Sequence, residues 1–108
     1  MVNERNNIEK WSGILKGLDT VALWGAGAKG VTFANLLDPA RKLIDCIVDL
    51  NPDKQGKFIP GSGHPIINYE ELQEREINAI IVMNPNYEAE IRQLILDLGL
   101  SIDILGME

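Results

Sequence analysis

The sequence feature that most constrains the fold is an apolar run that ends in closely spaced glycines. Residues 20–24 read Thr-Val-Ala-Leu-Trp, and Gly25, Gly27 and Gly30 follow at the spacing G-x-G-x-x-G. The run predicts a buried parallel strand, and the glycines predict a tight turn into a helix. In this motif the first glycine permits the turn, the second leaves space for a phosphate, and the third lets the helix pack on the strand. The helix start then suits an anion, because it offers free N–H groups and a positive dipole end.

An acidic residue follows the next apolar run. Asp49 ends the run at residues 43–49, 19 residues after Gly30. Dinucleotide-binding units place an acid at this point, where it accepts a hydrogen bond from a ribose hydroxyl. A turn with Asn51 is the alternative role for the same carboxylate. A strand, a glycine triplet, a helix and an acid in this register predict a nucleotide-binding unit of the α/β class.

The length of the chain limits how much of an enzyme it can contain. We expect the 108 residues to form a single domain, with an N-terminal helix in residues 1–19 and an α/β core in residues 20–105. A complete dinucleotide-binding fold uses two such halves, and a substrate domain usually follows. The chain is therefore short for a whole enzyme of this class.

Charge and cysteine content narrow the classes of partner. The net charge is −6, and residues 58–108 carry 9 acidic and 2 basic side chains. This charge disfavours binding to nucleic acid or to an anionic membrane. No apolar run approaches the roughly 20 residues that span a bilayer. Cys46 is the single cysteine, lies in an apolar run and is expected to be a core thiol. With no disulfide possible within the chain, we expect a cytoplasmic protein.

The remaining pattern alternates between helices and strands. Asn6 with Glu9 and Asn68 with Glu71 have the spacing of capping boxes, and Trp11 is expected to be a core residue rather than a base-stacking one. The predicted helices are 1–19, 28–37, 68–75 and 84–98, and the predicted strands are 20–24, 43–49, 65–67, 78–83 and 101–105.

This alternation predicts a Rossmann-like three-layer sandwich. Right-handed crossovers arrange the strands as a mostly parallel five-stranded sheet of order 3-2-1-4-5. Ligands in such open sheets bind beyond the carboxyl ends of the strands, at the point where the strand order reverses. The glycine loop and the segment 84–87 flank that point, and the loop 50–65 approaches from the second strand.

The loop 50–65 is unusually long, and its prolines and glycines exclude a long helix. Structureless loops of more than about 12–15 residues in compact domains tend to be functional or disordered. We expect an ordered loop that faces a ligand or a partner, with donors on Lys54, Lys57, Ser62 and His64.

Three segments thus supply the predicted site. Its candidate ligand-binding residues are Gly25, Ala26, Gly27, Lys29, Gly30, Asp49, Lys54, Lys57, His64, Asn84, Asn86 and Tyr87. Simpler roles remain open: Lys29 as a solvated surface side chain, His64 as an ordinary loop residue, and Tyr87 as packing over a helix start. We find no Ser/His/Asp or Cys/His arrangement, no paired acids and no metal-ligand spacing, so the sequence predicts no catalytic or metal-binding residue.

Several segments together resemble a known family. Residues 24–30, 48–61, 64–66, 84–87 and 90–91 are similar to the C-terminal domain of SAM-dependent sugar C-methyltransferases. Those enzymes act on nucleotide-linked deoxysugars. The similarity covers nearly the whole chain, and the long loop is its most specific part.

The resemblance implies a binding role rather than the methyl-transfer chemistry. In such enzymes a separate domain binds SAM and carries the catalytic bases. A further, cysteine-rich domain binds zinc, and the single Cys46 of this sequence could not build such a domain. The C-terminal domain is Rossmann-like and helps to hold the nucleotide-sugar. Carried over by position, the candidates for contact with the nucleotide-sugar or another domain are Gly25, Gly27, Lys29, Asp49, Lys54 and Asn84.

The leading hypothesis is a domain that binds a nucleoside-diphosphate sugar, with SAM reaching it only through a separate methyltransferase domain or subunit. An NAD(P)-binding half-domain of an oxidoreductase is the first alternative, because the glycine spacing and Asp49 also fit NAD. A SAM site in this chain and a docking domain without a ligand are further alternatives.

Overall fold

A parallel sheet of five strands forms the centre of the computed structural model, which describes residues 4–106. The order is β3-β2-β1-β4-β5, and all four neighbouring pairs are parallel. The strands are β1 (Val21–Trp24), β2 (Cys46–Val48), β3 (Ile66–Ile67), β4 (Ala79–Val82) and β5 (Asp103–Gly106). The Rossmann-like α/β fold and the strand order predicted from the sequence are confirmed.

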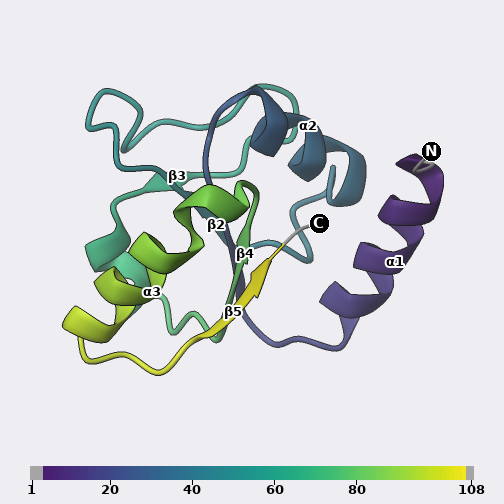
Figure 1. The fold of residues 1–108 in the computed structure, drawn as a ribbon. Coiled ribbons are helices and arrows are strands. Elements are labelled where there is room, and N and C mark those ends of the chain that lie inside the picture. Colours follow the sequence, from purple (N-terminus) through teal and green to yellow (C-terminus); the bar gives the residue numbers. More distant parts are fainter. Residues whose placement is uncertain (1–3, 107–108) are drawn as a thin grey trace.

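Helices cover both faces of the sheet, and Figure 1 shows α1 and α2 on one side and α3 on the other. The helices are α1 (Glu4–Lys16), α2 (Ala28–Leu37) and α3 (Glu88–Asp97), with short 3-10 helices η1 (Tyr69–Leu72) and η2 (Pro85–Tyr87). No helix in the described part of the chain is long and apolar enough to cross a membrane.

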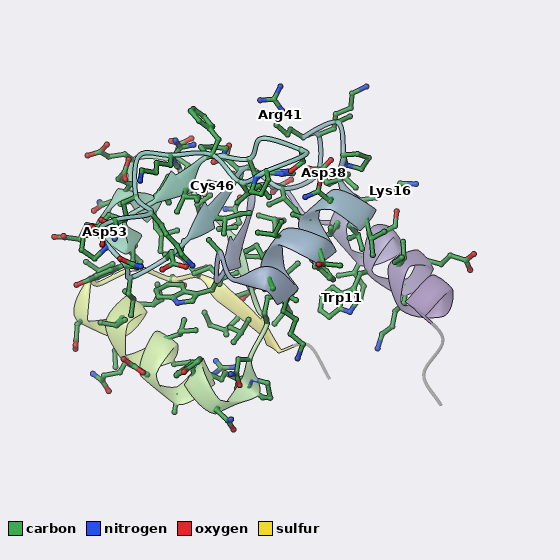
Figure 2. All side chains as sticks on the ribbon, turned by 90° about the horizontal axis from the view of Figure 1, so that it is seen from above. Trp11, Lys16, Asp38, Arg41, Cys46 and Asp53 are labelled. Carbon is green, nitrogen blue, oxygen red and sulfur yellow. The ribbon has the colours of Figure 1, made fainter. Side chains whose placement is uncertain are left out.

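The central strand β1 explains why its sequence is continuously apolar. Val21 and Leu23 belong to the core under α1 and α2, whereas Ala22 and Trp24 belong to the core under α3. All four residues of the strand are buried because both faces of the sheet are covered. Trp11 of α1, labelled in Figure 2, packs edge-to-face on Phe33 of α2, with ring centroids 6.1 Å apart. Trp11 is thus a core residue.

Two predicted elements are shorter than expected. β2 begins at Cys46 rather than residue 43, because the Asp38 carboxylate accepts hydrogen bonds from the N–H groups of Lys42 and Ile44 and holds this segment out of the ladder. The predicted helix at 68–75 is the 3-10 helix η1 followed by turns. Its capping box, formed by Asn68 with Glu71, is present.

Smaller differences occur at the ends of the chain. α1 already includes Asn6, so the predicted helix start at that residue is wrong. β5 begins at Asp103 instead of residue 101. Gly99 has a φ of +72°, the left-handed conformation that commonly ends a helix, and it follows α3 and the predicted helix 84–98.

The long loop 50–65 is ordered by its own backbone hydrogen bonds. Gly56 N–H donates to Ile66 and Ile59 N–H donates to the carbonyl of His64, so residues 56–59 fold back against β3. Asn35 of α2 holds the tip, since its side chain donates to the Pro60 carbonyl and accepts from Ser62 N–H. Most of this loop therefore packs on β3 and α2.

Candidate functional site

The glycine loop between β1 and α2 has the geometry that its spacing predicts. Gly25 has a φ of +118°, a conformation that favours glycine, and its N–H donates to the Val48 carbonyl over 2.7 Å. A Cβ on Gly30 would overlap the carbonyl oxygen of Gly25, so only glycine lets α2 approach β1 this closely. Nothing lies within 4 Å of the position that a Cβ on Gly27 would take. The loop is closed on its inner side and open above Gly27.

The start of α2 faces this open space. Gly27 is the N-cap of the helix, and within residues 4–106 no side chain caps the helix by accepting a hydrogen bond from the N–H groups of its first turn. The N–H groups of the first turn are therefore free to bind a ligand, and the helix dipole favours an anionic one. Lys29 lies in the same turn, is exposed and adds a positive charge.

Asp49 joins the end of β2 to the glycine loop. Its Oδ2 accepts from Ala26 N–H and its Oδ1 from Asn51 N–H, each over 2.9 Å. The Lys54 ammonium lies 3.9 Å from Oδ2 and 3.4 Å from the Ala26 carbonyl oxygen. One loop N–H is thus occupied by a carboxylate whose charge Lys54 partly offsets. Asp49 forms the turn with Asn51 that was the alternative to a ribose contact, and its remaining lone pairs can still accept from a ligand hydroxyl.

The segment after β4 forms the other wall. The Asn84 side chain accepts from Asn86 N–H over 3.0 Å, and Tyr87 N–H donates to the Asn84 carbonyl. This Asx turn starts η2, which runs directly into α3. The Tyr87 side chain is 55% exposed.

These three segments enclose a cleft of about 470 Å³ at the carboxyl ends of β1 and β4. That volume lies within the range of small-molecule sites in proteins. The lining residues are Trp24, Gly25, Gly27, Lys29, Gly30, Asp49, Leu50, Val82, Met83, Asn84, Tyr87, Glu90, Ile91 and Leu94. The cleft occupies the position where the strand order reverses, as expected from the topology.

Most of the residues singled out in the sequence lie at this cleft. Those that line it are Gly25, Gly27, Lys29, Gly30, Asp49, Asn84 and Tyr87. Ala26 and Lys54 contact Asp49 behind the lining, and Lys57 and Asn86 are exposed outside it. The apolar lining residues and Glu90 were not among the candidate site residues, although Trp24, Leu50, Glu90 and Ile91 lie in the segments that carry the family resemblance. Leu50 follows a predicted strand end, and the spacing of Glu90 and Leu94 after Tyr87 places all three on one face of a helix, which was the available signal.

His64 lies elsewhere, and its predicted position among the ligand-facing donors of the loop is wrong. The side chain is completely buried, with Nε2 at 2.9 Å from Asp38 Oδ2 and Nδ1 at 2.6 Å from Ser62 Oγ. Because a carboxylate only accepts, the ring donates to Asp38 through Nε2, and in a neutral imidazole Nδ1 is then the acceptor for the Ser62 hydroxyl. Asp38 lies near Arg41 at the end of α2, far from Asp53 in the view of Figure 2.

The Asp38 carboxylate is the centre of this buried group. It is 2% exposed and accepts from Lys42 N–H, Ile44 N–H and the His64 ring. Burial acts to raise the pKa of Asp38, but these hydrogen bonds outweigh it and hold the pKa below the ordinary value.

The group has the residue types of a Ser/His/Asp arrangement, which the sequence did not reveal because Asp38 lies 26 positions before His64. Ser62 and His64 do not line the cleft beside the glycine loop. They also do not line a second cleft, of about 400 Å³, at the amino ends of β1, β4 and β5. With every polar atom paired and the ring buried, Asp38, Ser62 and His64 act as a structural clamp between the loop and α2. Within residues 4–106, no cluster of His, Cys, Asp and Glu is arranged to hold a metal ion.

Comparison with known families identifies the class of domain. The family model of the C-methyltransferase C-terminal domain matches residues 9–97. The chain belongs to this family. The match includes the glycine loop, Asp49, the long loop and the segment after β4. The resemblance seen in the sequence is thereby confirmed. No curated protein shows significant similarity to this C-methyltransferase C-terminal domain.

Solved structures show the same fold at low sequence identity. RSP, a Rex-family repressor, superposes with a TM-score of 0.61 and 14% identity over 99% of this chain and 62% of its own. RSP in complex with β-NADH gives 0.58 and 18% over 98% and 62%. RSP in complex with β-NAD⁺ and operator DNA gives 0.56 and 17% over 92% and 56%. The C-methyltransferase C-terminal domain thus spans less than two thirds of each RSP chain.

Proposed function

We propose that this domain binds a nucleotide-linked sugar in the cleft and presents it to a SAM-dependent catalytic domain. The observation that carries the proposal is the convergence of the glycine loop, Asp49 and the segment after β4 on one cleft of about 470 Å³. Membership of a family of C-methyltransferase C-terminal domains supports the methyl-transfer context.

The phosphates are assigned to the start of α2. The uncapped helix start and the open space above Gly27 allow a phosphate to approach the backbone, and Lys29 adds a cation. These are the features with which glycine-loop helices bind phosphates. Asp49 accepts only one N–H on each oxygen, so it retains acceptor capacity for a ribose hydroxyl.

The domain's own contribution is to bind and orient. SAM, held by another domain, supplies the methyl group. In this chain the turn at Gly25 and the carboxylate–amide link between Asp49 and Ala26 fix the loop before a ligand arrives. A preorganised loop lowers the entropic cost of binding.

Isothermal titration of the full chain with dTDP-glucose and UDP-glucose tests the proposal. We expect saturable binding of at least one of the two nucleotide-sugars. Gly27→Ala should lower the affinity by about tenfold or more, because the added methyl group would occupy the space of a phosphate and remove roughly one hydrogen bond to it. Gly13→Ala is the matched control, since a Cβ on that α1 glycine would also have nothing within 4 Å. Absence of heat with both nucleotide-sugars in the wild type would refute the proposal.

A dinucleotide is the second candidate ligand. It is favoured by Asp49 at the end of β2 and by the RSP structures, which hold β-NADH and β-NAD⁺ in the same fold. NADH fluorescence separates the two candidates. Under the nucleotide-sugar proposal, NADH emission stays unchanged on mixing with the chain while dTDP-glucose binds, and the opposite result favours the dinucleotide.

A further inference from the structure

The cleft has two chemically different halves. One half is the glycine loop with Lys29 and Asp49, which offers backbone N–H groups and charges. The other half is apolar and lies between the end of β2 and the first turns of α3. Its lining residues are Trp24, Leu50, Val82, Met83, Tyr87, Ile91 and Leu94. A single ligand that fills the cleft must therefore carry an anionic part and an apolar part.

Two side chains of the apolar half are exposed to solvent. Leu50 is 46% exposed and Tyr87 is 55% exposed, and they come from different walls of the cleft. The surface beneath them includes Trp24 and Ile91, which are buried. A ligand that covers Leu50 and Tyr87 removes apolar surface from water, which favours binding.

Both exposed side chains stand on backbone that is already fixed. Leu50 lies between Asp49 and Asn51, whose Asx turn holds the chain, and the Gln55 side chain donates to the Asp49 carbonyl over 2.8 Å. Tyr87 lies in the second Asx turn, with its N–H bound to the Asn84 carbonyl. Hydrogen-bonded turns thus carry both side chains before a ligand arrives, and such preorganisation lowers the entropic cost of binding.

We propose that this apolar half holds the nucleobase of the nucleotide, stacked on Tyr87 and covered by Leu50, while the phosphates occupy the glycine-loop half. The inference rests on the proposed function and adds the place of the base. A sugar ring would leave its hydroxyls unpaired against Val82, Met83 and Leu94, whereas a base has apolar faces. Asn84 and Glu90 at the rim can pair with the polar edge of the base.

The test compares ligands that contain or lack the base. Dissociation constants of dTDP and of inorganic pyrophosphate are measured for the full chain and for Tyr87→Ala, Tyr87→Phe and Leu50→Ala. Loss of one base–aromatic stack corresponds to about a 5- to 150-fold weaker dTDP affinity for Tyr87→Ala. Tyr87→Phe keeps the ring, so its dTDP affinity stays within about threefold of the wild type. Leu50→Ala also weakens dTDP, and all three variants bind pyrophosphate like the wild type.

Phe58→Ala is the control, because Phe58 is an exposed aromatic residue, 67% accessible, outside the cleft. It should leave the dTDP affinity unchanged, and circular dichroism confirms that each variant folds. Unchanged dTDP affinity in Tyr87→Ala and Leu50→Ala overturns the inference alone. So does equal weakening of dTDP and pyrophosphate, or a Tyr87→Ala defect that appears with dTDP-glucose but not with dTDP. If the wild type binds neither dTDP-glucose nor UDP-glucose, the proposed function falls and the inference falls with it.

Discussion

Asp38 and His64 show how a buried polar pair can fix a loop. The carboxylate accepts three hydrogen bonds, and the imidazole connects it to Ser62 in the loop. Such a group is stable when every member is paired, and it becomes costly when one partner is removed. The sequence could not predict it, because Asp38 and His64 are 26 positions apart and belong to no motif. The nearest sequence signal was the presence of a single histidine between glycine and proline.

Asp38→Asn should destabilise the protein at neutral pH but much less in acid. One carboxylate oxygen becomes a donor, so at least one buried N–H loses its acceptor, which costs about 1–3 kcal/mol. The pKa of Asp38 is lower in the folded protein than in the unfolded chain. Its ionised form therefore stabilises the fold above the unfolded pKa, and this contribution disappears as the pH falls through the folded pKa.

Urea unfolding of the wild type and Asp38→Asn between pH 6 and pH 3 measures this effect. The difference in free energy of unfolding should narrow on acidification. Asp53→Asn, an exposed acid in a loop, should show no comparable difference at either pH. A gap for Asp38→Asn that stays constant or widens toward pH 3 would contradict this account.

At the scale of elements, the glycine loop assigns different tasks to its glycines. Gly30 is required for packing, because a Cβ there would overlap the Gly25 carbonyl. Gly27 has a φ of −79° and open space, so its task concerns whatever occupies the cleft. The motif spacing alone predicts both roles.

Gly30→Ala should therefore destabilise the fold by about 2 kcal/mol or more, because overpacking at a close helix–strand contact forces the backbone to shift. Gly27→Ala should change the free energy of unfolding by less than about 0.5 kcal/mol, as for other unstrained surface substitutions. Chemical denaturation of the two variants beside the wild type provides the comparison. Equal stability of both variants would show that α2 does not depend on the close contact with β1.

The order of elements was predictable, whereas some of their ends were not. Parallel strands with right-handed crossovers allow few arrangements, so the order 3-2-1-4-5 followed from the alternation of helices and strands. The start of β2 did not, because the residues before Cys46 are apolar like a strand but are bound to Asp38. A side chain from another element decided the boundary.

At the scale of the molecule, the position of the cleft was predictable and its apolar half was not. Ligand sites at the reversal of strand order follow from topology, which placed Gly25, Asp49 and Asn84 together. Leu50 and Leu94 come from separate elements and follow no shared pattern in the sequence. Only the folded chain brings such residues to one cleft.

Cys46 offers a measure of the stability of the whole sheet. Its thiol is completely buried in β2, and burial raises its pKa well above the ordinary value. Labelling by DTNB at pH 8 should be about 4,000-fold slower in the native protein than in the unfolded one, since it requires an opening of about 5 kcal/mol. A Cys46→Ala/Ser101→Cys variant, with an exposed cysteine, should react rapidly when folded. Equal rates for wild type and variant would mean that β2 opens locally.

The pairing of the central strand has a consequence for synthesis of the chain in the cell. Ala22 pairs with Cys46 on one side and with Ile80 on the other. At ribosomal speeds of about 5–20 residues per second, roughly 3–12 s pass between the emergence of β1 and that of its second partner, β4. Until β4 emerges, at least one edge of this apolar strand has no hydrogen-bonding partner. A chaperone that shields nascent apolar segments would bind β1 during this interval.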